Sequence, residues 1–195
     1  GNQITISGLI GSQTLTYTGA TANSANVGAD NYINAMTLAD GTGLSSNYAL
    51  PTLNATTAPV EISPKAVSIA GVKTYDATTG FVGSQVTITG MVGTETLTFT
   101  GAAANDANVA TANKYFSAIT LADDSGLASN YSLPSLTTAS ANNTVTINPL
   151  TLTLNSTTTT AVYSGTDALP NMTVSTGVGS QTVTLTNVSA YSANV

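Results

Sequence analysis

Residues 85–100 read QVTITGMVGTETLTFT, and apolar and polar residues alternate at both ends of this stretch. A period of two places Val86 and Ile88 on one face of a strand, and Leu97 and Phe99 on one face of the next. The link between them is rich in glycine, which supplies the positive φ that a tight connection needs. The stretch therefore predicts two short strands joined by a turn.

The same pattern recurs along the chain. Residues 3–27 read QITISGLIGSQTLTYTGATANSANV, and residues 85–109 read QVTITGMVGTETLTFTGAAANDANV. Residues 36–53 match residues 119–136 in the same way, with Lys114 read as one inserted residue, and a third copy of the pattern begins at residue 177. Repetition at a nearly fixed spacing indicates a chain built from similar units.

An Ile-x-Pro triplet introduces each unit, ending at Pro64 and again at Pro149. Proline removes a backbone donor and fixes φ, so it marks the end of a strand or a junction. We therefore expect three parts: the rear of a first copy at residues 1–63, one complete middle copy at 64–148, and the front of a third copy at 149–195. One complete copy of about 85 residues can bury a modest core.

Two more alternating stretches, at residues 144–147 and 151–154, predict strands on either side of the second proline. Residues 102–109 are rich in alanine and are expected to form one helical turn. No stretch carries a helical apolar stripe over three turns. Several short strands at turn-marked intervals predict an all-β fold of tandem β-sandwich units in series, which would form an elongated rod.

The composition excludes several classes of function. Hydrophobic residues make up 42% of the chain, too many for a disordered linker, and only 6% of residues are charged. Nine acidic residues against three lysines give a net charge of −6, so phosphate-neutralising cations for nucleic acid or for an anionic membrane are missing. No apolar run is long enough to span a bilayer, and we expect any export signal to lie upstream.

A family resemblance becomes visible at residues 72–79, which read VKTYDATT. This stretch resembles the K-x-Y-D-G-T-T signature of YDG repeats, although Ala77 occupies the glycine position. Residues 106–109 resemble the D-x-A-N-V-G stretch of that family, and residues 129–133 resemble its x-G-N-Y-x-L stretch. YDG repeats belong with the MBG-type repeats of large bacterial surface adhesins, including filamentous-haemagglutinin-like exoproteins.

The resemblance implies an extracellular protein at a bacterial cell surface. We expect a structural stalk segment of a secreted adhesin or biofilm-matrix filament, whose partners are other copies of the same fibre or matrix components. Because charge is scarce, lateral association of fibres is a variant. The alternative is a glycan- or protein-binding β-sandwich module of an adhesin.

We do not expect an enzyme, because the sequence contains no histidine and no cysteine. No catalytic, cofactor-binding or metal-ligating residue is therefore assigned. Structural calcium is conceivable at acidic residues near turns, but EF-hand spacing is absent, and capping of turns by the carboxylates is the favoured interpretation. The acidic residues in question are Asp40, Asp76, Asp106, Asp123 and Asp124.

Three further features have structural and functional interpretations. Lys73 and Lys114 could form isopeptide bonds, but neither recurs in every copy. Asn-x-Ser/Thr triplets arise readily in this composition; they begin at Asn54, Asn130, Asn155, Asn171 and Asn187. The repeated tyrosines could form a sugar-stacking platform, but a core aromatic with its hydroxyl bonded at a sandwich corner is favoured. These tyrosines are Tyr48, Tyr75, Tyr131 and Tyr163.

Overall fold

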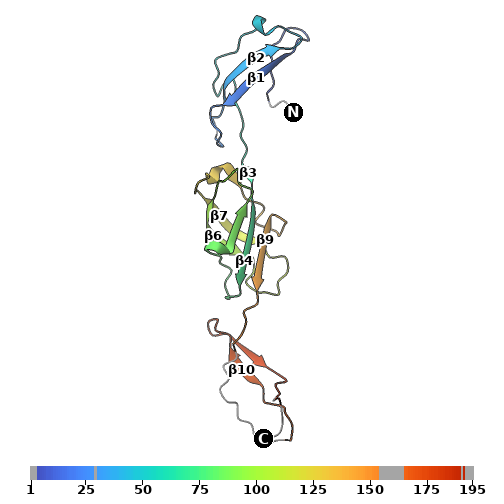
Figure 1. Ribbon diagram of the computed structural model, residues 1–195, viewed down its shortest axis with the longest axis vertical. Helices are drawn as coiled ribbons and strands as arrows, with labels where there is room; N and C mark the ends of the chain where they lie inside the picture. The colour runs from blue at the N-terminus through green and yellow to red at the C-terminus, as the bar shows by residue number, and fades with distance from the viewer. Residues whose placement is uncertain (1–3, 29, 154–164, 190, 192–195) are drawn as a thin grey trace. The chain divides into compact units, whose positions relative to one another are not determined.

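The computed structural model describes residues 4–28, 30–153, 165–189 and 191 (Figure 1). The strands are β1 (Leu15–Ala22), β2 (Ile33–Asp40), β3 (Lys65–Ala66), β4 (Ser68–Thr74), β5 (Val86–Thr89), β6 (Thr98–Ala104), β7 (Phe116–Ala122), β8 (Tyr131–Ser132), β9 (Asn143–Asn148), β10 (Met172–Ser175) and β11 (Thr182–Leu185). The 3-10 helices are η1 (Ser45–Asn47), η2 (Gly83–Gln85) and η3 (Ala128–Asn130). The described residues thus contain strands and single 3-10 turns, in agreement with the all-β prediction.

The strands form one sheet of three strands and several pairs. The three-stranded sheet has the order β5-β4-β9, and the pairs are β1-β2, β3-β8, β6-β7 and β10-β11. Strands β4 and β9 run parallel, with Ile69 opposite Asn143 and Lys73 opposite Ile147. Because β4 is the central strand, it supplies backbone partners to both of its neighbours.

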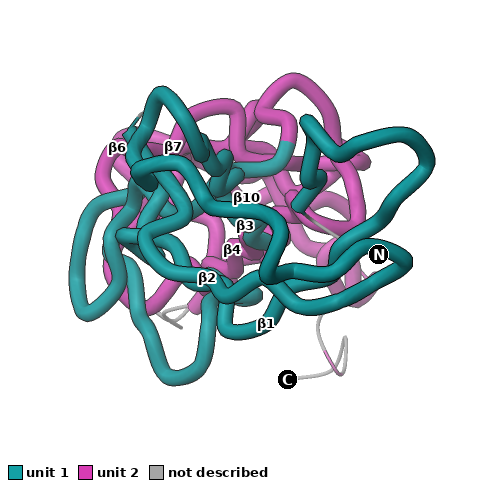
Figure 2. Tube along the Cα trace, turned by 90° about the horizontal axis from the view of Figure 1, so that it is seen from above, with its two compact units in different colours: residues 1–68, 88–98, 121–134 teal, residues 69–87, 99–120, 135–195 magenta. Residues whose placement is uncertain are grey.

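The described chain groups into two compact units, which Figure 2 colours separately. Unit 1 contains residues 1–68, 88–98 and 121–134, and unit 2 contains residues 69–87, 99–120 and 135–195. The division of the sequence at Pro64 and Pro149 stays a prediction. The names first, middle and third copy are used below for residues 1–63, 64–148 and 149–195.

Most of the expected strands are present. The alternation at the start of the opening stretch forms β5, with Val86 buried and Thr87 exposed, and residues 144–147 lie within β9. Strand β6 starts at Thr98, two residues after Thr96, where the alternation of this stretch begins, and it continues through Ala104. Gly90 and Gly93 in the connecting link have φ of 96° and 57°, which confirms that glycine supplies positive φ there.

Two expectations were wrong. The helical turn expected at residues 102–109 is absent, because Ala102 and Ala104 are buried on one face of β6. Tertiary packing here overrides the helix preference of alanine. Residues 151–153 are not a strand either, and Leu154 lies outside the described residues. Counting from Pro149 and Pro64, residues 151–153 correspond to residues 66–68, where β3 ends and β4 begins in the middle copy.

The core of unit 2 is built around two aromatic rings. Phe116 is fully buried and Phe81 nearly so, and their centroids lie 5.1 Å apart at an interplanar angle of 77°. This edge-to-face geometry is favoured by the ring quadrupoles. Gly71 of β4 leaves the space that the rings occupy, since a Cβ there would lie 2.4 Å from Cζ of Phe116. The close approach explains why glycine stands in the middle of a central strand.

A buried asparagine joins β9 to β7. The Asn143 side chain is fully buried; its Oδ1 accepts a hydrogen bond from the Phe116 backbone N–H at 2.8 Å. Its Nδ2 donates to the backbone oxygens of Phe116 and Ser135 at 3.0 and 2.9 Å. These bonds offset the cost of burying an amide.

The first and middle copies make matching backbone contacts. The Val60 N–H donates to the Asn31 oxygen at 2.9 Å, and the corresponding Val145 N–H donates to the Lys114 oxygen at 3.1 Å. Lys114 therefore occupies the position of Asn31 and is not itself the inserted residue, which corrects the alignment made from the sequence. Both side chains are buried and donate to a carbonyl of the preceding loop.

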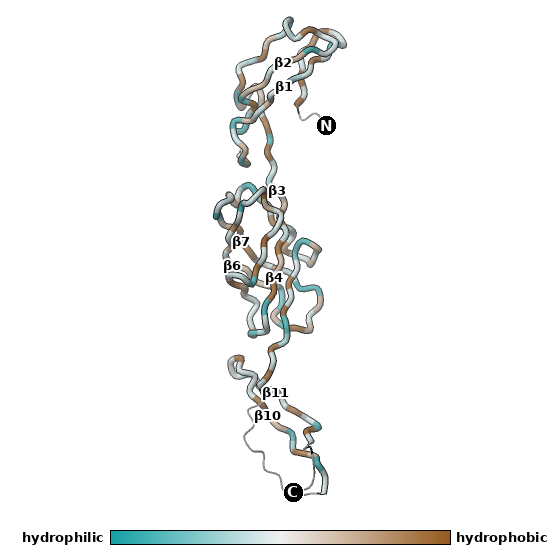
Figure 3. The backbone as a smooth tube through the Cα atoms, in the orientation of Figure 1, coloured by the Kyte–Doolittle hydropathy of each residue, from teal (hydrophilic) through white to brown (hydrophobic). Residues whose placement is uncertain are grey.

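Apolar residues are distributed in short runs along the backbone, as Figure 3 shows. Alternating strands place apolar residues at every second position, so no long apolar stretch builds up. The described part of the chain contains no helix with the length and apolar character that a membrane crossing requires.

Candidate functional site

The signature stretch at residues 72–79 begins on β4 and continues into the loop that follows. The period-two pattern that buries Ile69 and Gly71 also buries Lys73, so its side chain points to the core face of the strand. A lysine on this face places a cation inside unit 2. Such a cation is tolerated only when oxygen atoms surround it.

The following loop supplies those oxygens. Lys73 Nζ lies 2.7 Å from Asp76 Oδ1, and it donates to the Thr78 backbone oxygen and to Thr78 Oγ1 at 2.8 and 3.0 Å. It also donates to the Gly80 oxygen at 2.8 Å, and it lies 4.9 Å from the centroid of the Phe81 ring. The signature lysine therefore fixes the loop against the core, with a cation–π contact behind it.

Asp76 organises the turn as well as the charge pair. Its Oδ1 accepts hydrogen bonds from the backbone N–H and the hydroxyl of Thr78, both at 2.9 Å. Partial burial raises the pKa of Asp76, but the hydrogen bonds from Lys73 and Thr78 together outweigh this effect and hold the pKa below its usual value. The carboxylate is thus ionised in the folded chain at neutral pH.

Ala77 adopts a φ of 64°, which lies in the left-handed region. This conformation is unfavourable for a residue with a Cβ and free of that cost for glycine. The glycine of the family signature therefore has a conformational explanation at this position. Asn187 likewise has a left-handed φ, of 56°, at a position where the other copies have glycine. Those glycines are Gly19 and Gly101, with φ of 61° and 63°.

The Asn-Tyr motif at residues 130–131 is held by a second polar cluster. Tyr131 is buried; its hydroxyl accepts a bond from the Val92 N–H at 3.0 Å and donates to the Glu95 carboxylate. This hydrogen bond to Glu95 raises the pKa of Tyr131. The favoured interpretation, a core tyrosine with a bonded hydroxyl, is confirmed for this residue.

The first copy repeats the cluster with different side chains. The Tyr48 hydroxyl accepts from the Ile10 N–H at 3.2 Å and donates to Gln13 Oε1 at 2.5 Å. Gln13 stands where the middle copy has Glu95. Tyr48 is half-buried, whereas Tyr131 is buried. The hydroxyl bonds are thus shared by both copies although the charge of the acceptor is not.

The acidic residues considered for calcium serve as acceptors in turns. Asp40 Oδ1 accepts from the Ser45 N–H, and Asp123 Oδ1 accepts from the corresponding Ala128 N–H, both at 2.7 Å. Asp106 Oδ1 accepts from the Asn108 N–H at 2.6 Å. These bonds are the ones that turn capping predicts. Among the described residues, no three acidic side chains gather at a point where a metal ion could bind.

The lysines considered for isopeptide bonds and the remaining tyrosines do not form a common site among the described residues. Lys73 and Lys114 donate to oxygens of their own loops, Lys114 to the backbone of Val109 and Thr111, and no asparagine side chain is among these partners. Tyr75 is half-buried. Tyr163 and Asn155 lie outside the described residues.

Signature residues also bond to residues far away in the sequence. Within unit 1, Asn130 Nδ2 donates to Asn26 Oδ1, and Asn130 Oδ1 accepts from the Val27 N–H, both at 2.8 Å. Within unit 2, Gln181 Nε2 donates to the Tyr75 hydroxyl at 3.1 Å. Each contact joins motif residues that belong to different copies in the sequence.

The signature lysine, its aspartate and the positive φ at the next residue are the features that a K-x-Y-D-G-T-T motif requires. A YDG domain is found at residues 56–141. No curated protein matches the chain, and no solved structure matches it either. The domain covers most of the middle copy and starts eight residues before Pro64 (64 − 56).

Within this YDG domain, sequence reasoning missed the burial of Lys73 and its bond to Asp76. A signal for it was available, because Lys73 shares the alternation of Val67, Ile69 and Gly71. The YDG motif is thus a strand end and a turn fixed by an ion pair between the buried Lys73 and the exposed Asp76. Its polar atoms are engaged in stabilising the fold.

Proposed function

We propose that the chain is a structural stalk segment of a secreted bacterial adhesin or biofilm-matrix filament, located outside the cell. In this proposal, β-sandwich units in series form an elongated rod that sets the length and stiffness of a fibre. The YDG domain at residues 56–141 supports it, together with the internal repetition of the sequence. A linear array of this kind is stabilised unit by unit, with added terms at each junction.

The observation that carries the proposal is the use made of the repeated polar side chains. The tyrosine and aspartate of each motif, Tyr48 with Asp40 and Tyr131 with Asp123, bond to the same backbone positions in the first and middle copies. What recurs is therefore the fixing of loops. The bonds from Asn130 to Asn26 and Val27 suggest that motif residues also connect consecutive copies.

The alternative, a glycan-binding module, has no comparable observation in its favour. A stacking platform needs aromatic faces open to a ligand. Tyr131 is buried, and the hydroxyl groups of Tyr48 and Tyr75 bond to glutamine side chains.

Electron microscopy and a glycan array, both with the purified 195-residue chain, test the proposal. We expect thin particles of uniform width and no saturable binding to any glycan. Saturable binding to one glycan class by the whole chain, abolished by competing free sugar, would replace the stalk with a binding module. Lateral association predicts that particles bundle as concentration rises; particles that stay single at every concentration contradict that variant.

A further inference from the structure

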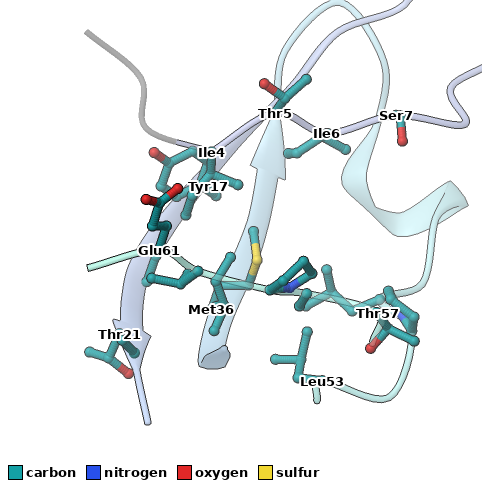
Figure 4. Close-up of a pocket in the computed structure, with 18 of the residues that line it drawn as sticks. Ile4, Thr5, Ile6, Ser7, Tyr17, Thr21, Met36, Leu53, Thr57 and Glu61 are labelled. Carbon is teal, nitrogen blue, oxygen red and sulfur yellow. The ribbon is translucent and has the colours of Figure 1, made fainter. Parts of the chain in front are cut away.

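A groove of about 930 Å³ opens on the first copy, within unit 1 (Figure 4). Ile4 and Ile6 lie on the segment along one border, and Glu61 lies on the segment along another. Met36 of β2 projects into the space between these segments. Apolar and polar surface contribute in similar shares to the lining, as on the face of a strand-binding groove that offers both side-chain contacts and backbone groups.

The two bordering segments have counterparts in the three-stranded sheet. By sequence, residues 4–7 correspond to β5, and residues 58–63 correspond to β9. In the middle copy these two strands do not touch each other, because β4 lies between them in the order β5-β4-β9. The groove thus lies where the sheet of the first copy would hold a strand of the β4 type.

The state of the borders agrees with an empty strand position. Neither residues 4–7 nor residues 60–63 form a strand, although their counterparts do. Val60 is half-buried, whereas its counterpart Val145 is only 8% exposed. The Val60 N–H nevertheless makes the same bond to Asn31 that Val145 makes to Lys114, so the border already occupies its place in the fold.

We propose that this groove binds an extended segment of the β4 type, with the alternation of residues 65–74, supplied by the opening segment of the same copy. The segment would run parallel to residues 58–63, as β4 does to β9, with the glycine equivalent to Gly71 opposite Val60. Strand addition of this kind gains main-chain hydrogen bonds from both borders and places alternate side chains in the groove. The inference does not depend on the stalk proposal.

A synthetic peptide with the sequence of residues 65–80 tests the site on the 195-residue chain. Hydrogen exchange should slow at the amides of residues 5–7 and of Glu61 when the peptide is added, whereas the Val60 amide is already bonded to the Asn31 oxygen and should not respond. Ile6→Asp places a charge in the groove and should weaken peptide binding tenfold or more, about 1.4 kcal/mol. Ile10→Asp is the matched control, because Ile10 is 75% exposed and does not line the groove; it should leave binding unchanged.

The source of the strand is tested by extending the chain. Gly1 corresponds to Gly83, so a copy of residues 65–82 placed before Gly1 continues the sequence as in the middle copy. In the extended chain, the same amides should be protected without peptide, and added peptide should no longer bind. If these amides are protected neither by the peptide nor in the extended chain, the proposal is wrong. Equal peptide binding to Ile6→Asp, or protection appearing at β5 and β9 instead, overturns it as well.

Discussion

Gly71 and the Phe116 ring define the tightest contact of the YDG domain at the scale of single residues. A Cβ at position 71 would lie 2.4 Å from Cζ of Phe116, and that ring is fully buried and cannot move aside. We expect Gly71→Ala to lower the free energy of unfolding by about 1–3 kcal/mol, through overpacking. Urea denaturation measures the change.

Gly80→Ala is the matched control for this substitution. No atom lies within 4 Å of a Cβ built at Gly80, and its φ is not positive. The control should change stability by less than about 0.5 kcal/mol. Equal effects of the two substitutions would show that Gly71 has no special packing role.

Ala77 offers the opposite case, a residue whose replacement should stabilise. Its φ of 64° costs about 1 kcal/mol for an alanine and little for a glycine. Ala77→Gly should therefore raise the free energy of unfolding by up to about 1 kcal/mol, despite the greater entropy of glycine in the unfolded chain. Ala110→Gly, at an exposed position without positive φ, should be neutral or destabilising. A loss of stability in Ala77→Gly would contradict the conformational explanation of the signature.

The Asp76 carboxylate makes stability depend on pH. Because its pKa is lower in the folded chain, the ionised form stabilises the fold above the ordinary carboxyl pKa of 3.8. This contribution is lost as pH falls through the folded pKa. The difference in unfolding free energy between the wild type and Asp76→Asn should therefore be largest at neutral pH and shrink below about pH 4. A difference that is constant, or that grows in acid, would contradict the role of the ion pair.

At the scale of elements, Asn143 of β9 makes two hydrogen bonds to Phe116 of β7 and a third to the backbone of Ser135. Asn143→Leu keeps the number of side-chain heavy atoms and the branching but leaves the Phe116 N–H and two backbone oxygens without this partner. We expect a loss of about 2–4 kcal/mol, because buried polar groups without partners are costly. Thermal unfolding measures it, with Asn148→Leu, at an exposed position of the same strand, as control. A loss of less than 0.5 kcal/mol, as expected of ordinary surface changes, would show that other groups satisfy Phe116.

The elements differ in how well the sequence predicts them. Strand β5 was predictable because Val86 and Ile88 alternate with threonine, and β-branched residues favour strands. The end of strand β6 was not predictable, because its last residues are alanines and alanine favours helices locally. Only packing against the core makes these residues part of a strand. Strand β4 carries Lys73 on its buried face, and only the loop oxygens from Asp76 to Gly80 make that burial possible.

The polar contacts were predictable where both partners are near in sequence. Asp40 and Asp106 bond to residues within five positions, and turn chemistry anticipates such bonds. The partners of Asn143 and Tyr131 lie on other strands and loops, up to 39 positions away in the bond from Val92 to Tyr131. Such pairs depend on the fold, so a single sequence does not reveal them.

The whole molecule contains a YDG domain and a repeated sequence, and the polar residues that recur stabilise loops. Under the stalk proposal, each added copy would bring its own core and would add to the length of the fibre. The groove of the first copy fits the same view, because a strand of the β4 type would complete its sheet. Length per copy is the quantity on which the stalk proposal depends.

Small-angle X-ray scattering of a chain with one further copy of residues 64–148 tests that claim most directly. The insertion adds 85 residues (148 − 63) to the 195 of the chain. Units in series predict a maximum dimension that grows in proportion to chain length, by roughly 40%, whereas a compact body of the same size would grow by only about 15% in radius of gyration. A near-proportional increase is the expected result, and growth close to the compact value would contradict the stalk.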